Sequence, residues 1–207
     1  MRNLPWNNVD DLKFLHDATL RVPKFNLSGA PFEVKSEYVR DHVWKFQPAV
    51  SVEIKNSIAA LKLPDRYVSM QVRRGDKQTE HPFVPLEKYV AVVGQWFKAD
   101  PSLPRVVYVA TDSAVVVDEL HKMAPDNKGH FQQVHNKWDV TKKKEALIDL
   151  LIDLELVRKA SFHVCTFSSN MGRWMRVLRR GLHPDETTVS VDLTGMFTDK
   201  LGDKVLF

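Results

Sequence analysis

The stretch Tyr67-Val68-Ser69-Met70-Gln71-Val72-Arg73-Arg74-Gly75-Asp76-Lys77 decides the fold and points to a site. It begins as an apolar-rich run with the character of a β-strand and ends in a cluster of cationic side chains. In an α/β protein, ligands bind at the carboxyl ends of parallel strands. Two arginines and a lysine at such an end suit a diphosphate, because their N–H groups pair well with phosphate oxygens. A solvated basic turn is the alternative that this stretch alone leaves open.

Strand-like and helix-like patterns alternate along the chain from about residue 38 onward. Short runs with strand character predict strands at 67–72, 105–110, 131–134, 161–166 and 187–191, and the run at 105–110 is rich in β-branched residues. Apolar residues at helical spacing predict helices at 49–61, 85–96, 114–123, 143–159 and 170–180. This alternation indicates βαβ units, and hence an α/β, Rossmann-like three-layer domain with a mostly parallel sheet. We expect the domain at 38–207 and an irregular segment or linker at 1–37.

The composition is that of an ordinary globular protein. Hydrophobic residues make up 43% and charged residues 27% of the 207 residues. The net charge of +4 permits an anionic ligand but does not require nucleic acid, because the basic residues form no long tract. The single cysteine, Cys165, excludes an internal disulfide and a cysteine-rich zinc site, and its apolar neighbours predict a buried side chain.

The sequence as written shows no targeting signal. It has no apolar run of transmembrane length, and Met1–Asp11 lack the basic-then-apolar plan of a signal peptide. We therefore expect a cytoplasmic protein if the chain is complete. A segment upstream of Met1 in a longer protein would change that expectation.

Polar side chains follow three of the predicted strands at one edge of the sheet. In chain order they are Arg73-Arg74-Gly75-Asp76-Lys77, then Thr111-Asp112-Ser113, then Thr166 with Ser168-Ser169. The last group directly precedes a helix, whose first N–H groups have no partner within the helix and can hold an anion. Hydroxyl and amide groups opposite two arginines predict a pyrophosphate cradle. Helix capping alone explains the second or third group taken singly.

Other chemistries find little support in the sequence. It lacks the glycine-rich, P-loop, nucleophile-elbow and HExxH motifs, and it has no Asp-x-Asp pair to hold a nucleotide-bound metal. The eight histidines are scattered, and we expect His81 and His163 to be ordinary surface or core residues. Glu80, four residues beyond Asp76, can accept a proton from a hydroxyl, although a solvated glutamate is the simpler interpretation.

Four motifs in the same order resemble those of the α-1,6-fucosyltransferases, which add core fucose to N-glycans or fucosylate bacterial Nod factors. Residues 71–77 are similar to the family's His-Val-Arg-Arg-Thr-Asp-Lys, and residues 83–89 to its Phe-His-Pro-Ile-Glu-Glu-Tyr. Residues 107–112 are similar to Val-Tyr-Leu-Ala-Thr-Asp. Residues 162–169, which contain Val-Cys-Thr-Phe-Ser-Ser, nearly match the last motif, and Leu182-His183-Pro184-Asp185 follows as in the family.

The resemblance implies a GT-B glycosyltransferase, of which this chain corresponds to the C-terminal, donor-binding half. It implies metal-independent, inverting transfer of fucose from GDP-fucose to a hydroxyl of a glycan acceptor, either an N-glycan or a chito-oligosaccharide-like chain. It implies no cofactor, no metal and no nucleic-acid partner. For a longer chain it implies the Golgi or another secretory compartment. The oligomeric state is left open.

The resemblance also carries roles to individual residues. The donor-binding positions are Arg73, Arg74, Asp76, Tyr89, Asp112, Asp153, Ser168 and Ser169. By resemblance, Arg73 holds the pyrophosphate and Arg74 assists it, the two serines bind phosphate, and Asp153 contacts the guanine. Tyr89 and Asp112 complete the donor pocket. The catalytic positions are Arg73, Lys77 and Glu80, with Glu80 activating the acceptor hydroxyl.

Three positions depart from the family pattern. Gln71 replaces a histidine, Gly75 replaces a threonine, and Ser113 stands where the core-fucosylating enzymes have a second aspartate. We also expect the first GT-B domain to be absent from this chain. Two alternatives therefore remain beside the transferase: a non-catalytic module that binds GDP or a GDP-sugar, or a truncated inactive homologue that serves as a structural or partner-binding domain.

Overall fold

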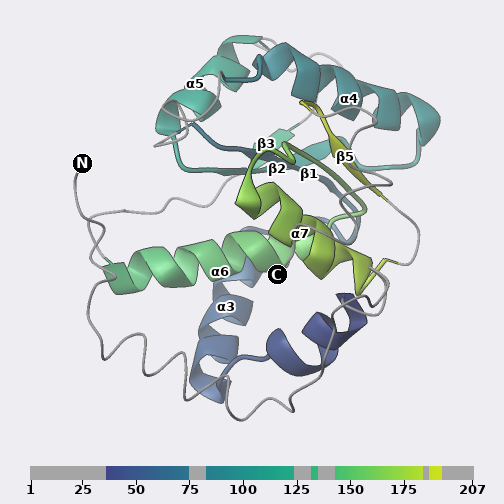
Figure 1. Ribbon diagram of the computed structural model, residues 1–207. Coiled ribbons are helices and arrows are strands. Elements are labelled where there is room, and N and C mark those ends of the chain that lie inside the picture. The colour runs from purple at the N-terminus through teal and green to yellow at the C-terminus, as the bar shows by residue number, and fades with distance from the viewer. Residues whose placement is uncertain (1–35, 75–82, 124–131, 135–142, 184–186, 193–207) are drawn as a thin grey trace.

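The computed structural model describes residues 36–74, 83–123, 132–134, 143–183 and 187–192. Figure 1 shows a sheet between two helical layers. The strands are β1 (Val68–Val72), β2 (Val106–Thr111), β3 (Gln132–Val134), β4 (Phe162–Cys165) and β5 (Thr188–Ser190). The helices are η1 (Val39–Val43), α3 (Pro48–Ala60), α4 (Leu86–Ala99), α5 (Ala114–Met123), α6 (Lys143–Lys159) and α7 (Asn170–Arg180). In the described part of the chain, no helix is long and apolar enough to cross a membrane.

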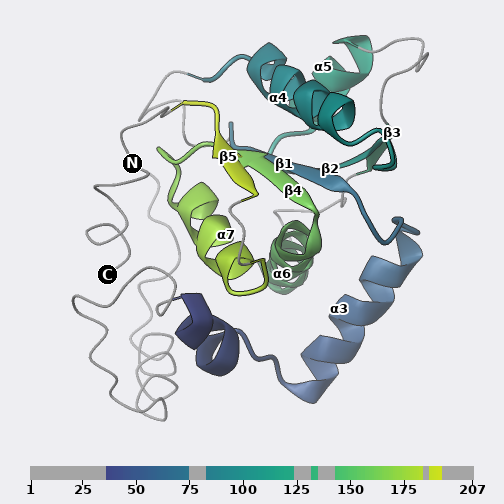
Figure 2. The same ribbon diagram turned by 90° about the vertical axis from the view of Figure 1, so that its right-hand side faces the viewer.

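The sheet is parallel throughout and has the strand order β3-β2-β1-β4-β5. Helices α4 and α5 cover one face, and α6 and α7 cover the other, with α3 and η1 outside them (Figure 2). The α/β, Rossmann-like three-layer prediction is therefore confirmed. Every predicted strand and helix from residue 48 onward is present, and α5, α6 and α7 have the predicted bounds.

The central strand β1 is buried along its whole length. Val68, Met70 and Val72 pack in the core beneath α4 and α5. Since side chains alternate across a strand, Ser69 and Gln71 lie on the opposite face, which α6 and α7 cover. Both are buried polar residues. This second face thus carries the buried polar side chains of β1.

Helix α6 corrects a prediction from periodicity. Its spacing predicts one apolar side made of Leu147, Leu150, Leu151, Leu154 and Val157. Leu147 is instead 49% exposed, whereas every residue from 152 to 157 is buried. Residues 152–157 lie in or beside the core shared by β2, α3 and α7, so this part of α6 is buried on more than one side. Burial along this helix therefore changes from end to end rather than from side to side.

The sequence prediction of ordinary core residues is confirmed for Cys165 and His163, which are fully buried. The Ser69 hydroxyl donates to the Phe162 carbonyl at 3.3 Å and lies 2.9 Å from Nδ1 of His163. Nδ1–H therefore donates to Ser69, and the buried Nε2 has no hydrogen-bond partner within the described residues. Burial first, and then the charge of Arg179, hold the pKa of His163 well below its usual 6.5.

We expect this histidine to make the fold acid-sensitive. As the pH falls below 6.5, the unfolded chain takes up a proton that folded His163 rejects, so the free energy of unfolding decreases. The loss approaches about 1.4 kcal/mol per pH unit until the folded pKa is reached. Urea unfolding of the wild type and of His163→Asn, which keeps a polar group near Ser69 but does not titrate, measures this. Equal pH dependence in the two proteins would contradict the expectation.

Candidate functional site

The ends of β1 and β2 meet through Asp112. The backbone N–H of Arg74 donates to Oδ1 of Asp112 at 2.8 Å, and Nη1 of Arg73 lies 3.7 Å from Oδ2. The hydrogen bond fixes the turn that follows β1, while the longer ion pair leaves Arg73 partly exposed. Asp112 therefore holds the turn after β1 in place and lies beside the Arg73 guanidinium.

The two adjacent arginines point to different surroundings. Nη1 of Arg74 donates to Glu119 on α5 at 2.6 Å, and its guanidinium lies 5.5 Å from the centroid of the Phe83 ring. Arg73 instead lines a small cavity at the carboxyl edge of the sheet. Arg73 is thus the arginine directed to the candidate site, and Arg74 is anchored on the side of α5.

The cavity at this edge has a volume of about 30 Å³, room for only about one or two water molecules. It is lined by Gln71, Arg73, Ala110, Thr111, Asp112, Leu150, Asp153, Met171 and Met175. Three of the predicted site residues are therefore brought together, namely Arg73 directly after β1, Asp112 directly after β2 and Asp153 on α6. We call it the donor cavity below, because the family resemblance assigns Arg73, Asp112 and Asp153 to the expected donor-binding positions.

Two buried acceptors face the donor cavity. Asp153, on α6, is 4% exposed, and Oδ1 of its carboxylate accepts a hydrogen bond from the buried hydroxyl of Tyr108. Gln71 is also 4% exposed, and its Oε1 has no hydrogen-bond partner among the described residues. A buried acceptor without a partner is costly. An N–H donor from a ligand would satisfy it.

The loop between β4 and α7 is held by a carboxylate that sequence reasoning missed. The backbone N–H groups of Phe167 and Ser168 donate to Asp192 at 3.0 and 3.1 Å, and the Ser190 hydroxyl donates to it at 2.6 Å. Burial raises the pKa of Asp192, but the hydrogen bonds from Ser168, Ser190 and Phe167 together lower this pKa by more. The pKa of Asp192 therefore lies below its usual value. Asp192 is isolated in the sequence, and only the fold brings it to this loop.

The predicted phosphate-binding serines lie where α7 begins. Ser169 is the N-cap residue, is buried, and makes no side-chain capping hydrogen bond. The N–H of Ser168 is already used by Asp192. The amides of the first helical turn, which starts at Asn170, have no partners within the helix and carry its positive dipole end. Because Met171 and Met175 of α7 line the donor cavity, this helix start lies beside it.

Tyr89 contacts the loop between β4 and α7 from the side of α4. It belongs to α4, on the opposite face of the sheet from the donor cavity, and it is buried. Its hydroxyl is hydrogen-bonded to Thr166, and burial raises its pKa above the usual value. Within the described residues, Tyr89 therefore supports the loop after β4. The remaining predicted positions, Asp76, Lys77 and Glu80, lie outside the described residues.

The strand order makes the carboxyl edge of the sheet the expected place for a ligand. From β1 the chain moves to β2 and β3 on one side, and then crosses to β4 and β5 on the other. In open parallel sheets the ligand crevice lies at such a switch point, outside the carboxyl ends of the strands. Arg73 and the start of α7 flank it. The described residues contain no group of three or more His, Cys, Asp or Glu that could hold a metal ion.

The chain is similar in sequence to known fucosyltransferases. The model of the alpha-(1,6)-fucosyltransferase N- and catalytic domains matches residues 32–193. An alpha-(1,6)-fucosyltransferase of Caenorhabditis elegans is 25% identical over 160 residues, which is 70% of this chain and 28% of that protein. An alpha-(1,6)-fucosyltransferase of Drosophila melanogaster is 25% identical over 130 residues, 57% of this chain and 20% of that protein. The chain thus spans less than a third of the length of these relatives.

A solved structure shares the fold. The structure of POFUT1 in complex with GDP-fucose superposes with a TM-score of 0.50 at 12% identity, covering 77% of this chain and 48% of that one. At this identity the likeness concerns the fold alone. The family model, in contrast, covers most of the chain, including all five strands and the donor cavity. The chain therefore belongs to the alpha-(1,6)-fucosyltransferase family.

Proposed function

We propose that this chain binds GDP-fucose at the carboxyl edge of its sheet and is the donor-binding half of a fucosyltransferase with a GT-B architecture. The observation that carries the proposal is the convergence of Arg73, Asp112 and Asp153 on one cavity beside the start of α7. A guanidinium and a helix N-terminus both favour a diphosphate. Membership of a fucosyltransferase family supports a fucose nucleotide as the ligand.

The reaction we propose is a single displacement at the anomeric carbon of fucose. The acceptor oxygen forms a bond to this carbon, while the bond to the β-phosphate oxygen breaks and GDP leaves with the electron pair. Glu80 takes the proton of the acceptor hydroxyl, Lys77 assists it, and the configuration inverts. Arg73 and the amides of α7 stabilise the charge that develops on the diphosphate, so the step needs no metal ion.

The base of the nucleotide fits the buried acceptors. A guanine edge presents an amino group and a ring N–H, which are hydrogen-bond donors. Oxygens of Asp153 and Gln71 are acceptors at the donor cavity. The cavity is too small for a purine as it stands. Side chains that line it, such as those of Met171 and Met175, must therefore move when the nucleotide enters.

Only membership of the family supports a proposal for the acceptor and the location. We propose a glycan acceptor, with an N-glycan or a chito-oligosaccharide-like chain as the two candidates, and a secretory location such as the Golgi. Acceptor binding in this proposal also requires the parts of the longer relatives that this chain does not cover.

Arg73→Ala is expected to weaken GDP binding by about 1 kcal/mol or more, which is at least about fivefold in Kd, because a charge-assisted contact to phosphate is lost. Arg66→Ala is the matched control, since Arg66 precedes the opposite end of β1 and pairs with Asp100. Calorimetric titration with GDP at one fixed salt concentration measures both. If the two variants bind GDP equally well, Arg73 does not hold the diphosphate.

Glu80→Gln is expected to abolish fucose transfer and to leave GDP affinity nearly unchanged, because it removes only the proton acceptor. Transfer is measured with GDP-fucose and each glycan acceptor, and affinity by calorimetry.

The second candidate function is a module that binds the nucleotide without transferring fucose. Gln71 and Gly75, which replace family residues, favour it. Wild-type chain that binds GDP but transfers to neither acceptor would support the module, and loss of GDP affinity in Glu80→Gln would contradict the role given to Glu80.

A further inference from the structure

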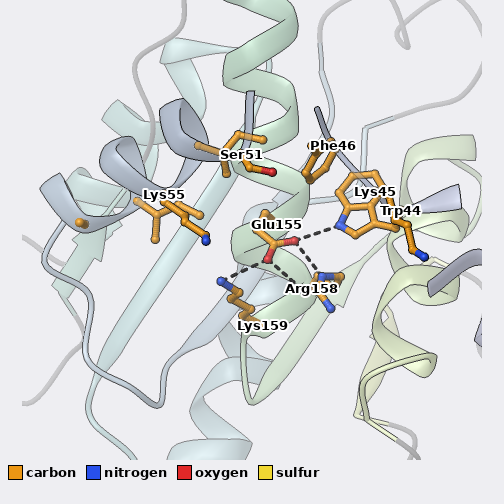
Figure 3. A pocket seen from close by; sticks show the side chains of 11 residues that line it. Trp44, Lys45, Phe46, Ser51, Lys55, Glu155, Arg158 and Lys159 are labelled. Carbon is orange, nitrogen blue, oxygen red and sulfur yellow. Dashed lines mark hydrogen bonds and ion pairs between the residues drawn. The ribbon is translucent and has the colours of Figure 1, made fainter. Parts of the chain in front are cut away.

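A second and much larger cavity lies on the other side of α6. It has a volume of about 600 Å³ and lies between residues 44–46, α3 and the C-terminal end of α6 (Figure 3). This size is in the range of pockets that hold small organic molecules. We call it the α3–α6 cavity.

The α3–α6 cavity is separate from the donor cavity. Glu155 lines it, whereas Asp153, two residues earlier on α6, lines the donor cavity. Two residues turn a helix by about 200°, so the two carboxylates project from nearly opposite sides. The α3–α6 cavity also includes Lys159, after which Ser161 donates its N–H to Tyr67 at the amino ends of β4 and β1. It therefore lies toward the edge of the sheet opposite the donor site.

Positive charge dominates the α3–α6 cavity. Four cations, Lys45, Lys55, Arg158 and Lys159, line it with one carboxylate, that of Glu155. This gives a net formal charge of +3. A cavity with this charge favours an anionic occupant.

The carboxylate is fully engaged. Glu155 accepts from Arg158 at 2.8 Å on each oxygen, from Trp44 Nε1 at 3.0 Å, and lies 3.1 Å from Nζ of Lys159. Burial raises the pKa of Glu155, but the hydrogen bonds from Arg158 and Trp44 bring it below its usual value, so it stays ionised. Within the described residues, no ion pair joins Lys55 to a carboxylate.

Apart from Ser51, the rest of the lining is apolar and includes two rings. The hydrogen bond to Glu155 holds the Trp44 indole in place, and Phe46 packs edge-on against it with ring centroids 4.8 Å apart. The other apolar side chains are those of Ile54, Ile58 and Ala59 on α3. Figure 3 shows the ammonium groups of Lys55 and Lys159 directed into the same space below α3. The cavity thus combines an apolar wall with a cationic rim.

We propose that the α3–α6 cavity binds a small organic anion that has a flat apolar body and a phosphate or carboxylate group. The apolar body lies against Trp44 and Phe46, and the anionic group lies between Lys55 and Lys159. Glu155 already pairs with Lys159 and with Arg158, whereas within the described residues no carboxylate pairs with Lys55, so Lys55 is the main cation left for the ligand. This proposal does not depend on the reaction at the donor cavity.

The test is calorimetric titration of the whole chain with 1-naphthyl phosphate in the presence of excess GDP, which occupies the donor site. Inorganic phosphate and 1-naphthol are the matched probes, since each carries one half of the ligand. We expect each half alone to bind at least about tenfold more weakly than naphthyl phosphate, because the charged and apolar contacts are then no longer combined. The proposal is overturned if naphthol binds as well as naphthyl phosphate, if excess GDP prevents binding, or if naphthyl phosphate does not bind at millimolar concentration.

A pair of charge reversals locates the site. Lys55→Glu is expected to weaken naphthyl phosphate binding at least about tenfold, because an attraction becomes a repulsion inside the cavity. Lys98→Glu makes the same change in net charge on α4, on the other face of the sheet, and is expected to change the affinity by less than about twofold. GDP binding should be the same in both variants. Equal weakening of naphthyl phosphate binding in the two variants would show attraction by net charge alone and would overturn the proposal.

Discussion

Arg179→Met is expected to destabilise the fold by about 4 kcal/mol, since buried acceptors left without a donor cost about 1–3 kcal/mol each. Arg179 is 1% exposed and donates to the carbonyls of Val157 and Ala160 at 2.7 and 2.6 Å. It also donates to the hydroxyls of Thr187 and Thr188 at 2.6 and 3.0 Å. One arginine on α7 therefore closes the C-terminal end of α6 and holds the start of β5.

The direction of this effect follows from the fixed acceptors. Removing a buried charge recovers its desolvation cost, and replacement by an apolar residue is often harmless when both partners of an ion pair are replaced. Here the acceptors at Val157 and Ala160 are backbone carbonyls, which no side-chain substitution removes. The positive charge of Arg179 also interacts favourably with the negative, C-terminal end of the α6 dipole. Loss of hydrogen bonds therefore outweighs the recovered desolvation.

Urea unfolding measures this effect. Arg66→Met is the control, because Arg66 makes an exposed ion pair with Asp100 and should lose no more than about 1 kcal/mol. Arg179→Lys keeps the charge but not the fork of donors, so its stability should fall between those of Arg179→Met and the wild type. Equal loss in Arg179→Met and Arg66→Met would refute the role given to Arg179.

Gly172→Ala is expected to cost about 3 kcal/mol or more, because an added methyl group forces a backbone shift in a packed region. A Cβ at Gly172 would lie 2.1 Å from the carbonyl oxygen of Thr166 and 3.4 Å from Sγ of Cys165. The atom it meets first is backbone, in the loop between β4 and α7. That loop cannot yield without disturbing the start of α7, where we place the diphosphate. GDP affinity should therefore decrease together with stability.

Gly94→Ala is the matched substitution, because Gly94 is also inside a helix and a Cβ there meets nothing within 4 Å. Alanine at such a position stabilises a helix by about 0.5–1 kcal/mol. Thermal or urea unfolding of the two variants should thus give opposite signs. A Gly172→Ala protein as stable as the wild type would mean that α7 does not approach the loop as closely as the structure indicates.

The fold was predictable because its signals are local. The β-branched run of β2 and the helical spacing of α5, α6 and α7 are each contained in one short stretch of sequence. The alternation of these elements then leaves few arrangements besides a parallel sheet. Leu147 was mispredicted because periodicity describes the sides of a helix and not how far each end extends beyond its neighbours.

The site was predictable only in part. Arg73 and Arg74 are equivalent in the sequence, and only the positions of Phe83 and Glu119 distinguish their environments. Asp192 holds the loop before α7 from 24 residues away in the chain. Local patterns cannot show such contacts, because they depend on how separate strands align. The resemblance to a family identified the donor-binding positions, and the structure showed which of them line one cavity.

Chemical-shift mapping with GDP is the most direct test of where the nucleotide binds. The backbone amide of Arg74, which donates to Asp112, reports on the end of β1, and the amides of Ser169 and Asn170 report on the start of α7. The indole N–H of Trp44, which donates to Glu155, reports on the opposite end of α6. We expect added GDP to shift the first three resonances and to leave the Trp44 indole unchanged. A shift of the Trp44 indole with none at Arg74, Ser169 and Asn170 would contradict a donor site at the carboxyl edge of the sheet.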